Sequence, residues 1–134
     1  NYIERFFQNC LPIDEHSYFK TIEGVQVSSH FLIKRTGEVV QFVSCEDRAW
    51  HAGKSVFLGE ENCNDFSLGV ELEGADDVSY EPLQYQVLIE LTRAIQHSYP
   101  EICLDRIAGH EHIAPGRKTD PGPAFDWVAY RTQI

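Results

Sequence analysis

The chain has 134 residues, of which 43% are hydrophobic and 12% aromatic, the size and composition of one globular domain with its own core. A net charge of -10 at pH 7 argues against a nucleic-acid partner, whose phosphates would be repelled, and gives no reason to expect an anionic membrane. No apolar run approaches the ~20 residues that a membrane-spanning helix needs.

The first part of the chain predicts a helix followed by a β-hairpin. Residues 2–9 place apolar side chains on one helical face, and an irregular connection over residues 11–24 follows. Residues 27–34 and 38–43 read as strands, because the Thr-Gly pair at 36 and 37 is a hairpin turn signal. His30 lies among apolar neighbours in the first strand, where a packed histidine is more common than a metal ligand.

A long loop over residues 44–64 comes next. A loop of this length without structure of its own tends to be functional. It contains Trp50, which is either an exposed platform for a sugar ring or peptide, or a plug beneath the loop.

The segment 66–74 shows the clearest strand alternation, with Phe66, Leu68, Val70 and Leu72 on one face. Glu71 falls on the opposite face, where the small residues Ser67 and Gly69 leave room in front of it. Glu71 therefore suits the floor of an open site. A solvated sheet face is the competing interpretation for Glu71 and Glu73, and it is the preferred one for Glu73.

Residues 82–98 predict an amphipathic helix that begins at a proline and covers the apolar face of that strand. Its expected stripe is Leu83, Val87, Leu91, Ala94 and Ile95.

The end of the chain predicts a short strand at 107–108, a stiff loop to residue 127 and a terminal helix over 126–133. This order of elements predicts an α/β fold, a mixed β-sheet packed with α-helices in a single domain over residues 1–134.

The loop 109–127 holds the strongest candidates for chemistry. His110 and Asp120, with nine residues between them, are a plausible nitrogen and oxygen pair of zinc ligands, and Lys118 can reach the same point. A cation beside a metal suits an oxyanion formed during hydrolysis. A polar surface loop with an incidental histidine is the competing interpretation. His112 leaves a further alternative open, because in an extended segment it shares a face with His110.

Four cysteines, Cys10, Cys45, Cys63 and Cys103, are scattered without a Cys-x-x-Cys motif. They are compatible with two disulfides in a secreted protein. The plainer interpretation is four reduced thiols in a cytosolic one.

Four separated stretches, in this order, resemble one family. They read VSSHFLIKR at 27–35, RAWHAG at 48–53, CNDFSLGVELEG at 63–74, and GHEHIAPGRKTDPGPAFDW at 109–127. The chain resembles the zinc-dependent N-acetylmuramoyl-L-alanine amidases, which are related to peptidoglycan recognition proteins. Within that family it is most similar to the cytosolic members that act on 1,6-anhydro-muropeptides.

The resemblance implies an activity and a set of site residues. The activity is zinc-dependent hydrolysis of the amide between (1,6-anhydro-)N-acetylmuramic acid and L-alanine, by a cytoplasmic monomer that recycles muropeptides and so influences inducible β-lactamase. The residues are His110 and Asp120 for Zn²⁺, Glu71 as catalytic acid/base, Lys118 for the oxyanion, Tyr18 near the metal, and Trp50, Asn64 and Arg117 in the substrate cleft.

One departure stands out. The family's first zinc ligand is a histidine ahead of the helix that begins here at Tyr2, and no residue aligns with it. We therefore expect this chain to lack that segment, to hold zinc weakly and to be inactive. Two other functions stay open: a zinc-free muropeptide-binding module, and a lytic amidase that acts on polymeric peptidoglycan.

Overall fold

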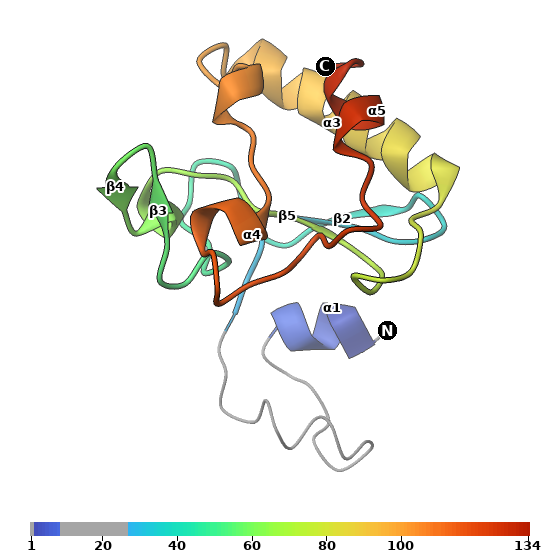
Figure 1. Cartoon of the computed structure of the whole chain (residues 1–134), viewed down its shortest axis with the longest axis horizontal. Coiled ribbons are helices and arrows are strands. Elements are labelled where there is room, and N and C mark those ends of the chain that lie inside the picture. The colour runs from blue at the N-terminus through green and yellow to red at the C-terminus, as the bar shows by residue number, and fades with distance from the viewer. Residues whose placement is uncertain (1, 9–26) are drawn as a thin grey trace.

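The structure, a computed structural model, describes residues 2–8 and 27–134 (Figure 1). Tyr18, Cys10 and the expected connection over 11–24 lie outside the described residues. None of the helices in the described part of the chain is long and apolar enough to cross a membrane.

A three-stranded mixed sheet in the order β2-β1-β5 forms the centre of the molecule. β1 (Phe31–Ile33) pairs antiparallel with β2 (Val39–Gln41) and parallel with β5 (Val70–Leu72). All three residues of β1 are buried, which agrees with an unbroken apolar run in a central strand. The expected hairpin and the mixed sheet are therefore confirmed, with strands shorter than the alternation predicts.

The hairpin closes through Gly37, whose φ of 84° lies in the left-handed region that glycine adopts without strain. Gly37 N donates to Lys34 O at 2.9 Å, and Lys34 N donates to Glu38 O at 2.9 Å. The register of β1 against β2 follows from this turn, with Leu32 opposite Val40.

Helix α3 (Pro82–Ser98) and helix α5 (Trp127–Arg131) lie on one side of the sheet, and α1 (Tyr2–Phe7) lies on the other (Figure 1). The core forms where α3, α5 and the sheet meet, and its buried members are Ile33, Tyr80, Leu88, Phe125 and Tyr130. On the opposite side, Glu4 of α1 forms an ion pair with Lys34 at 2.5 Å.

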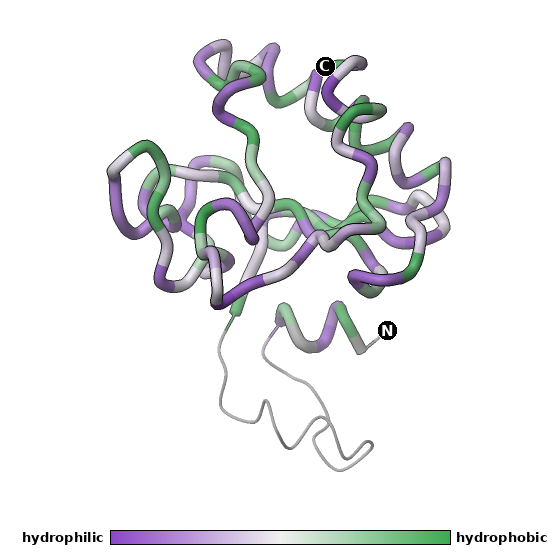
Figure 2. Tube along the Cα trace, in the orientation of Figure 1, coloured by the Kyte–Doolittle hydropathy of each residue, from purple (hydrophilic) through white to green (hydrophobic). Residues whose placement is uncertain are grey.

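The buried face of α3 differs from the predicted stripe. Hydrophobic and hydrophilic residues alternate along the helix (Figure 2), but Leu83 and Ala94 are exposed whereas Gln84, Leu88 and Thr92 are buried. Polar side chains cause this rotation, because Thr92 shares a 2.7 Å hydrogen bond with the hydroxyl of Tyr130 in α5. Hydrophobic periodicity takes no account of buried polar residues, so the predicted stripe lies about one residue before the face that is actually buried.

The predicted long loop 44–64 contains structure that the sequence analysis missed. β3 (Val56–Phe57) and β4 (Glu60–Glu61) form a two-stranded ribbon, and a 3-10 turn (Cys63–Asp65) follows it. The predicted strand at 107–108 is wrong. A 3-10 turn (Leu104–Arg106) precedes these residues, and helix α4 (His110–Ile113) begins directly after Gly109.

Gln84 joins the start of α3 to the sheet and generates the first prediction. Its side chain is fully buried, accepts from Glu81 N at 2.9 Å, and donates to Glu73 O at 3.0 Å and Ile33 O at 3.4 Å. Gln84→Leu keeps the volume but removes the donor to Glu73 O and the acceptor for Glu81 N, while Ile33 O keeps its bond from Glu73 N at 2.9 Å. We expect the free energy of unfolding to fall by roughly 2–4 kcal/mol in urea titrations.

Gln86→Leu, on the exposed face of the same helix, is the matched control and should change stability by no more than about 0.5 kcal/mol. Equal effects of the two substitutions would contradict the anchoring role of Gln84.

Candidate active site

The loop after α4 is held against the segment that follows β5, so its side chains have fixed positions. Ala124 N donates to Asp76 O at 3.2 Å, and the Thr119 hydroxyl donates to the Asp76 carboxylate. Tyr80 donates to Pro121 O at 2.9 Å. Gly122, at φ 83°, passes so close that an added Cβ would lie 2.5 Å from the side chain of Asp76. A side chain at Gly122 would therefore push the loop away from the segment that follows β5.

His110 and Asp120 are brought together at this point. His110 Nδ1 lies 3.1 Å from Asp120 Oδ2, and His110 Nε2 lies 2.9 Å from Ala52 O. Burial is the largest single effect and disfavours both charged forms. The mutual hydrogen bond, the attraction between the two charges and hydrogen bonds to the backbone together outweigh it, so the pKa of His110 is raised and the pKa of Asp120 is lowered. The carbonyl and the carboxylate both accept, so the imidazolium satisfies both, and a metal ion would replace the proton on Nδ1.

Glu71 occupies the middle of β5, between Val70 and Leu72, which pack against the core. Burial raises the pKa of Glu71 to about 7, and the charge of Asp120 adds to this, while His110 and Lys118 act in the opposite direction. A carboxyl group with a pKa near neutrality is suited to take up and return a proton. The strand pattern correctly placed Glu71 on the face away from the core.

Lys118 is exposed, and its ammonium group forms no ion pair or hydrogen bond with the described residues, although its backbone N–H donates to Ala114 O at 3.0 Å. Its charge nevertheless acts on Glu71, His110 and Asp120. Lys118 is therefore an available cation beside the carboxylate and imidazole groups, and its role in stabilising an oxyanion stays a prediction.

Trp50 is exposed, with 59% of its surface accessible, which rules out the plug interpretation. The guanidinium of Arg48 lies 3.7 Å from the centre of its ring and pairs with Asp65 at 2.7 Å. The backbone of Trp50 is fastened to Ser28 by hydrogen bonds of 3.0 and 2.8 Å. The indole is thus a fixed platform two residues from Ala52, as a substrate-contacting residue requires.

Asn64 and Arg117 have most of their polar groups engaged within the protein. Asn64 is buried, and its Oδ1 accepts from His51 N at 3.0 Å and Ala52 N at 2.7 Å. Arg117 donates to Ala52 O at 2.6 Å and to Lys54 O at 2.8 Å. Their contact with substrate stays a prediction, while their structural role in holding the 51–54 loop was not expected from the sequence.

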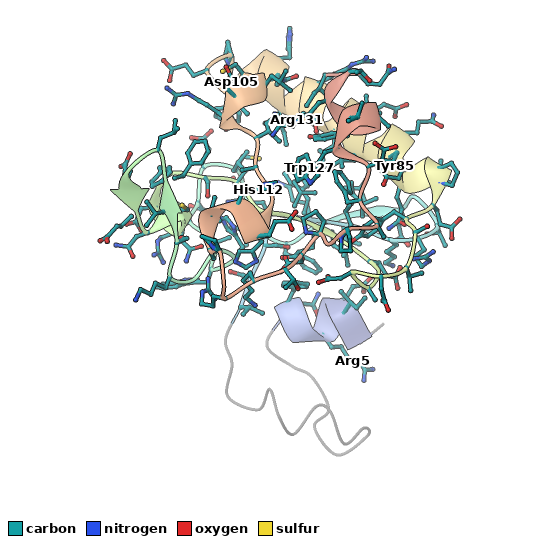
Figure 3. The ribbon with its side chains drawn as sticks, in the orientation of Figure 1. Arg5, Tyr85, Asp105, His112, Trp127 and Arg131 are labelled. Atoms are coloured by element: carbon teal, nitrogen blue, oxygen red, sulfur yellow. The ribbon has the colours of Figure 1, made fainter. Side chains whose placement is uncertain are left out.

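His112 does not join His110, because the segment is helical rather than extended and the two side chains point in different directions. His112 Nδ1 instead accepts from Gly109 N at 2.9 Å, and its ring packs against Trp127 at 5.2 Å (Figure 3). The alternative in which His110 and His112 chelate together is therefore wrong.

His30 is a packed histidine, as expected. Its Nδ1 accepts from Gly69 N at 3.1 Å and its Nε2 donates to Asp47 O at 2.8 Å, so it ties the start of β1 to the 44–54 loop and to β5. His51 stacks edge-on against it at 5.7 Å. Burial lowers the pKa of His51 to about 4, which keeps this ring neutral.

Within residues 2–8 and 27–134, no three His, Cys, Asp or Glu side chains converge to hold a metal ion. His110 and Asp120 thus supply one nitrogen and one oxygen donor, a combination that suits zinc. They line a cavity of about 910 Å³, together with Glu71 and with Leu88 and Thr92 of α3.

The sequence matches the N-acetylmuramoyl-L-alanine amidase family over residues 1–123. It is 50% identical over 133 residues to the 1,6-anhydro-N-acetylmuramyl-L-alanine amidase AmpD of Salmonella typhimurium. The alignment covers 99% of this chain and 71% of that protein. It is 38% identical over 130 residues to the N-acetylmuramoyl-L-alanine amidase AmiD of Escherichia coli, covering 85% of this chain and 47% of the relative.

Solved structures agree with the sequence matches. A crystal structure of a selenomethionine derivative of AmpD superposes with a TM-score of 0.96 at 47% identity, covering 99% of this chain and 74% of the other. Escherichia coli AmiD, in complex with the substrate anhydro-N-acetylmuramic acid-L-Ala-D-γ-Glu-L-Lys, gives a TM-score of 0.74 at 37% identity, covering 87% and 51%. These likenesses confirm the fold class predicted from the sequence.

The raised pKa of Glu71 leads to a prediction about stability. Between pH 4.5 and about 7 the folded protein keeps a proton that the unfolded chain loses, so this carboxyl group lowers stability as pH rises. In the presence of a chelator and above pH 7, the free energy of unfolding of Glu71→Gln should exceed that of the parent by roughly 1–3 kcal/mol in urea titrations. The difference should vanish below pH 4.5.

Glu90→Gln, on the exposed face of α3, controls for the loss of one negative charge. A Glu71→Gln advantage that is the same at pH 4 and pH 8 would show that burial does not act on the ionised carboxylate.

Proposed function

The chain belongs to the N-acetylmuramoyl-L-alanine amidase family, and we propose that it hydrolyses the amide between (1,6-anhydro-)N-acetylmuramic acid and L-alanine in small muropeptides. One observation carries the assignment of the centre: His110 Nδ1 and Asp120 Oδ2 converge at 3.1 Å beside a buried carboxyl group whose pKa is about 7. Two potential metal donors and a proton-transfer group at one point are what amide hydrolysis needs.

His110 and Asp120 are the residues that would hold zinc. A zinc ion bound there supplies a Lewis acid that polarises the scissile carbonyl and makes water more acidic. Ala52 O, which accepts from His110 Nε2, keeps the other ring nitrogen directed at Asp120. Such partners of ligand histidines fix the ring orientation, and their loss typically weakens metal binding.

Glu71 takes the proton from the attacking water and returns it to the nitrogen of L-alanine as the C–N bond breaks. A pKa of about 7 suits both steps, because the group is then neither permanently charged nor permanently protonated at neutral pH. The ammonium group of Lys118, which has no hydrogen-bond or ion-pair partner among the described residues, is available to stabilise the negative charge that develops on the carbonyl oxygen.

The substrate side of the proposal rests on Trp50 and its surroundings. The exposed indole is a flat apolar surface suited to a sugar ring or a lactyl group. AmiD of Escherichia coli binds an anhydro-muramyl peptide, and we propose a ligand of the same class here. We also propose that the protein acts in the cytoplasm as a monomer, which agrees with the free thiols of Cys45, Cys63 and Cys103.

Glu71→Gln tests the proposed proton-transfer group. The variant keeps the shape of the side chain and cannot act as a base, so turnover of an anhydro-muropeptide should fall by roughly 10²–10⁴. Zinc-saturated protein and chromatographic detection of the released peptide provide the assay, and turnover by the parent chain would also refute the expectation that this chain is inactive. Turnover near that of the parent would remove Glu71 from the mechanism.

Lys118→Ala separates transition-state stabilisation from substrate binding. If Lys118 acts on the developing oxyanion alone, kcat should fall by about 10²–10³ while KM changes little. Arg5→Ala removes an exposed cation of α1, which points away from the rest of the protein (Figure 3), and controls for the net charge. A rise in KM at unchanged kcat would assign Lys118 to ground-state binding instead.

A further inference from the structure

The backbone of Ala52 is held at its N–H and at its carbonyl oxygen by groups distant in sequence. Asn64 Oδ1 accepts from its N–H at 2.7 Å, and its carbonyl oxygen lies 2.9 Å from His110 Nε2 and 2.6 Å from Arg117 Nη2. We infer that Arg117 is a positioning residue, which fixes the Ala52 carbonyl and through it the orientation of the His110 ring. This inference rests on the proposed function of His110.

Arg117 binds the turn at two points. Its Nη2 donates to Ala52 O and to Lys54 O, and its Nε donates to Lys54 O at 3.2 Å. One planar guanidinium therefore bridges the carbonyls on the two sides of Gly53, a fixed double contact that the ammonium of lysine does not reproduce.

Gly53 is shaped for this contact. It has a φ of 60°, and a Cβ added there would lie 3.0 Å from Arg117 Nη2 and 3.2 Å from Nη1. The turn thus depends on glycine both for its left-handed backbone and for the approach of the guanidinium. Two independent features, the hydrogen bonds and the missing side chain, indicate that the chain is built around Arg117 at this position.

The consequence for His110 follows from hydrogen-bond chemistry. A carbonyl oxygen only accepts, so the His110 nitrogen that faces Ala52 must carry a proton, and Nδ1 is the nitrogen presented to Asp120. Asn64 fixes the N–H of Ala52, but the carbonyl of Ala52 can still rotate about the Cα–C bond. Arg117 donates to this carbonyl oxygen at 2.6 Å and so restricts the rotation.

This role differs from a direct contact between Arg117 and substrate. Three of its hydrogen bonds go to backbone carbonyls, and only Nη1 forms none with the described residues. A residue that acts through His110 changes the rate of the chemical step, whereas one that holds substrate changes KM.

The experiment compares Arg117→Ala with Arg93→Ala in the full chain. Arg93 also donates its guanidinium to a backbone carbonyl, Gln133 O at 2.8 Å, but lies on the outer face of α3. In zinc-saturated protein we expect Arg117→Ala to lower kcat about 10–100-fold with KM within about twofold, because lost support of a ligand histidine typically has this effect. Arg93→Ala should leave both constants unchanged. A raised KM at unchanged kcat in Arg117→Ala would overturn the inference.

A spectroscopic measurement keeps the inference separate from the proposed function. In ¹⁵N-labelled, metal-free protein the Nε2–H proton of His110, assigned by its loss in His110→Ala, should be protected from exchange in the parent and in Arg93→Ala. In Arg117→Ala and in Gly53→Ala it should exchange at least about tenfold faster, because the carbonyl is no longer held. An unchanged exchange rate in Arg117→Ala contradicts the inference, whether or not the parent hydrolyses muropeptides. Absence of hydrolysis in the parent, with the expected exchange, refutes only the proposed function.

Discussion

The imidazole of His110 lies between two oxygen atoms that only accept hydrogen bonds, the carbonyl of Ala52 and the carboxylate of Asp120. This arrangement fixes the ring in one orientation and concentrates negative potential on its Nδ1 side. The raised pKa of His110 and the lowered pKa of Asp120 are consequences of the same contact. A cation is stabilised there, either a proton or a metal ion that replaces it.

The rest of the fold holds the His110–Asp120 pair in place from two sides. On one side, Asp76 and Tyr80 hold the loop that carries Asp120, and the core beneath it is formed by α3, α5 and the sheet. On the other side, the loop that carries Ala52 is fastened by Ser28, Asn64 and Arg117. Glu71 reaches the centre from the edge strand β5, where burial rather than a neighbouring charge is the main cause of its raised pKa. A site assembled on loops thus gains precision from hydrogen bonds to the backbone.

The sequence predicted the parts of this arrangement that depend on local pattern. Alternation in the segment 66–74 placed Glu71 opposite the core face, and Thr-Gly at 36 and 37 located the hairpin. It failed where polar groups decide the packing: the buried Gln84 and Thr92 turn α3 away from the stripe that hydrophobicity indicates. It also missed the helical turn at His110, because a helix of four residues between Gly109 and Ala114 carries little periodicity. The contribution of Ala52 had no sequence signal, since any residue offers a carbonyl, and Gly53 was the only hint of a constrained turn.

Anomalous scattering at the zinc absorption edge, from crystals soaked in excess zinc, tests the central claim most directly. We predict one peak next to Nδ1 of His110 and the carboxylate of Asp120, on the side of the ring away from Ala52, and loss of this peak in Asp120→Ala. A peak at Nε2, at another histidine such as His112, or undiminished in Asp120→Ala would contradict it.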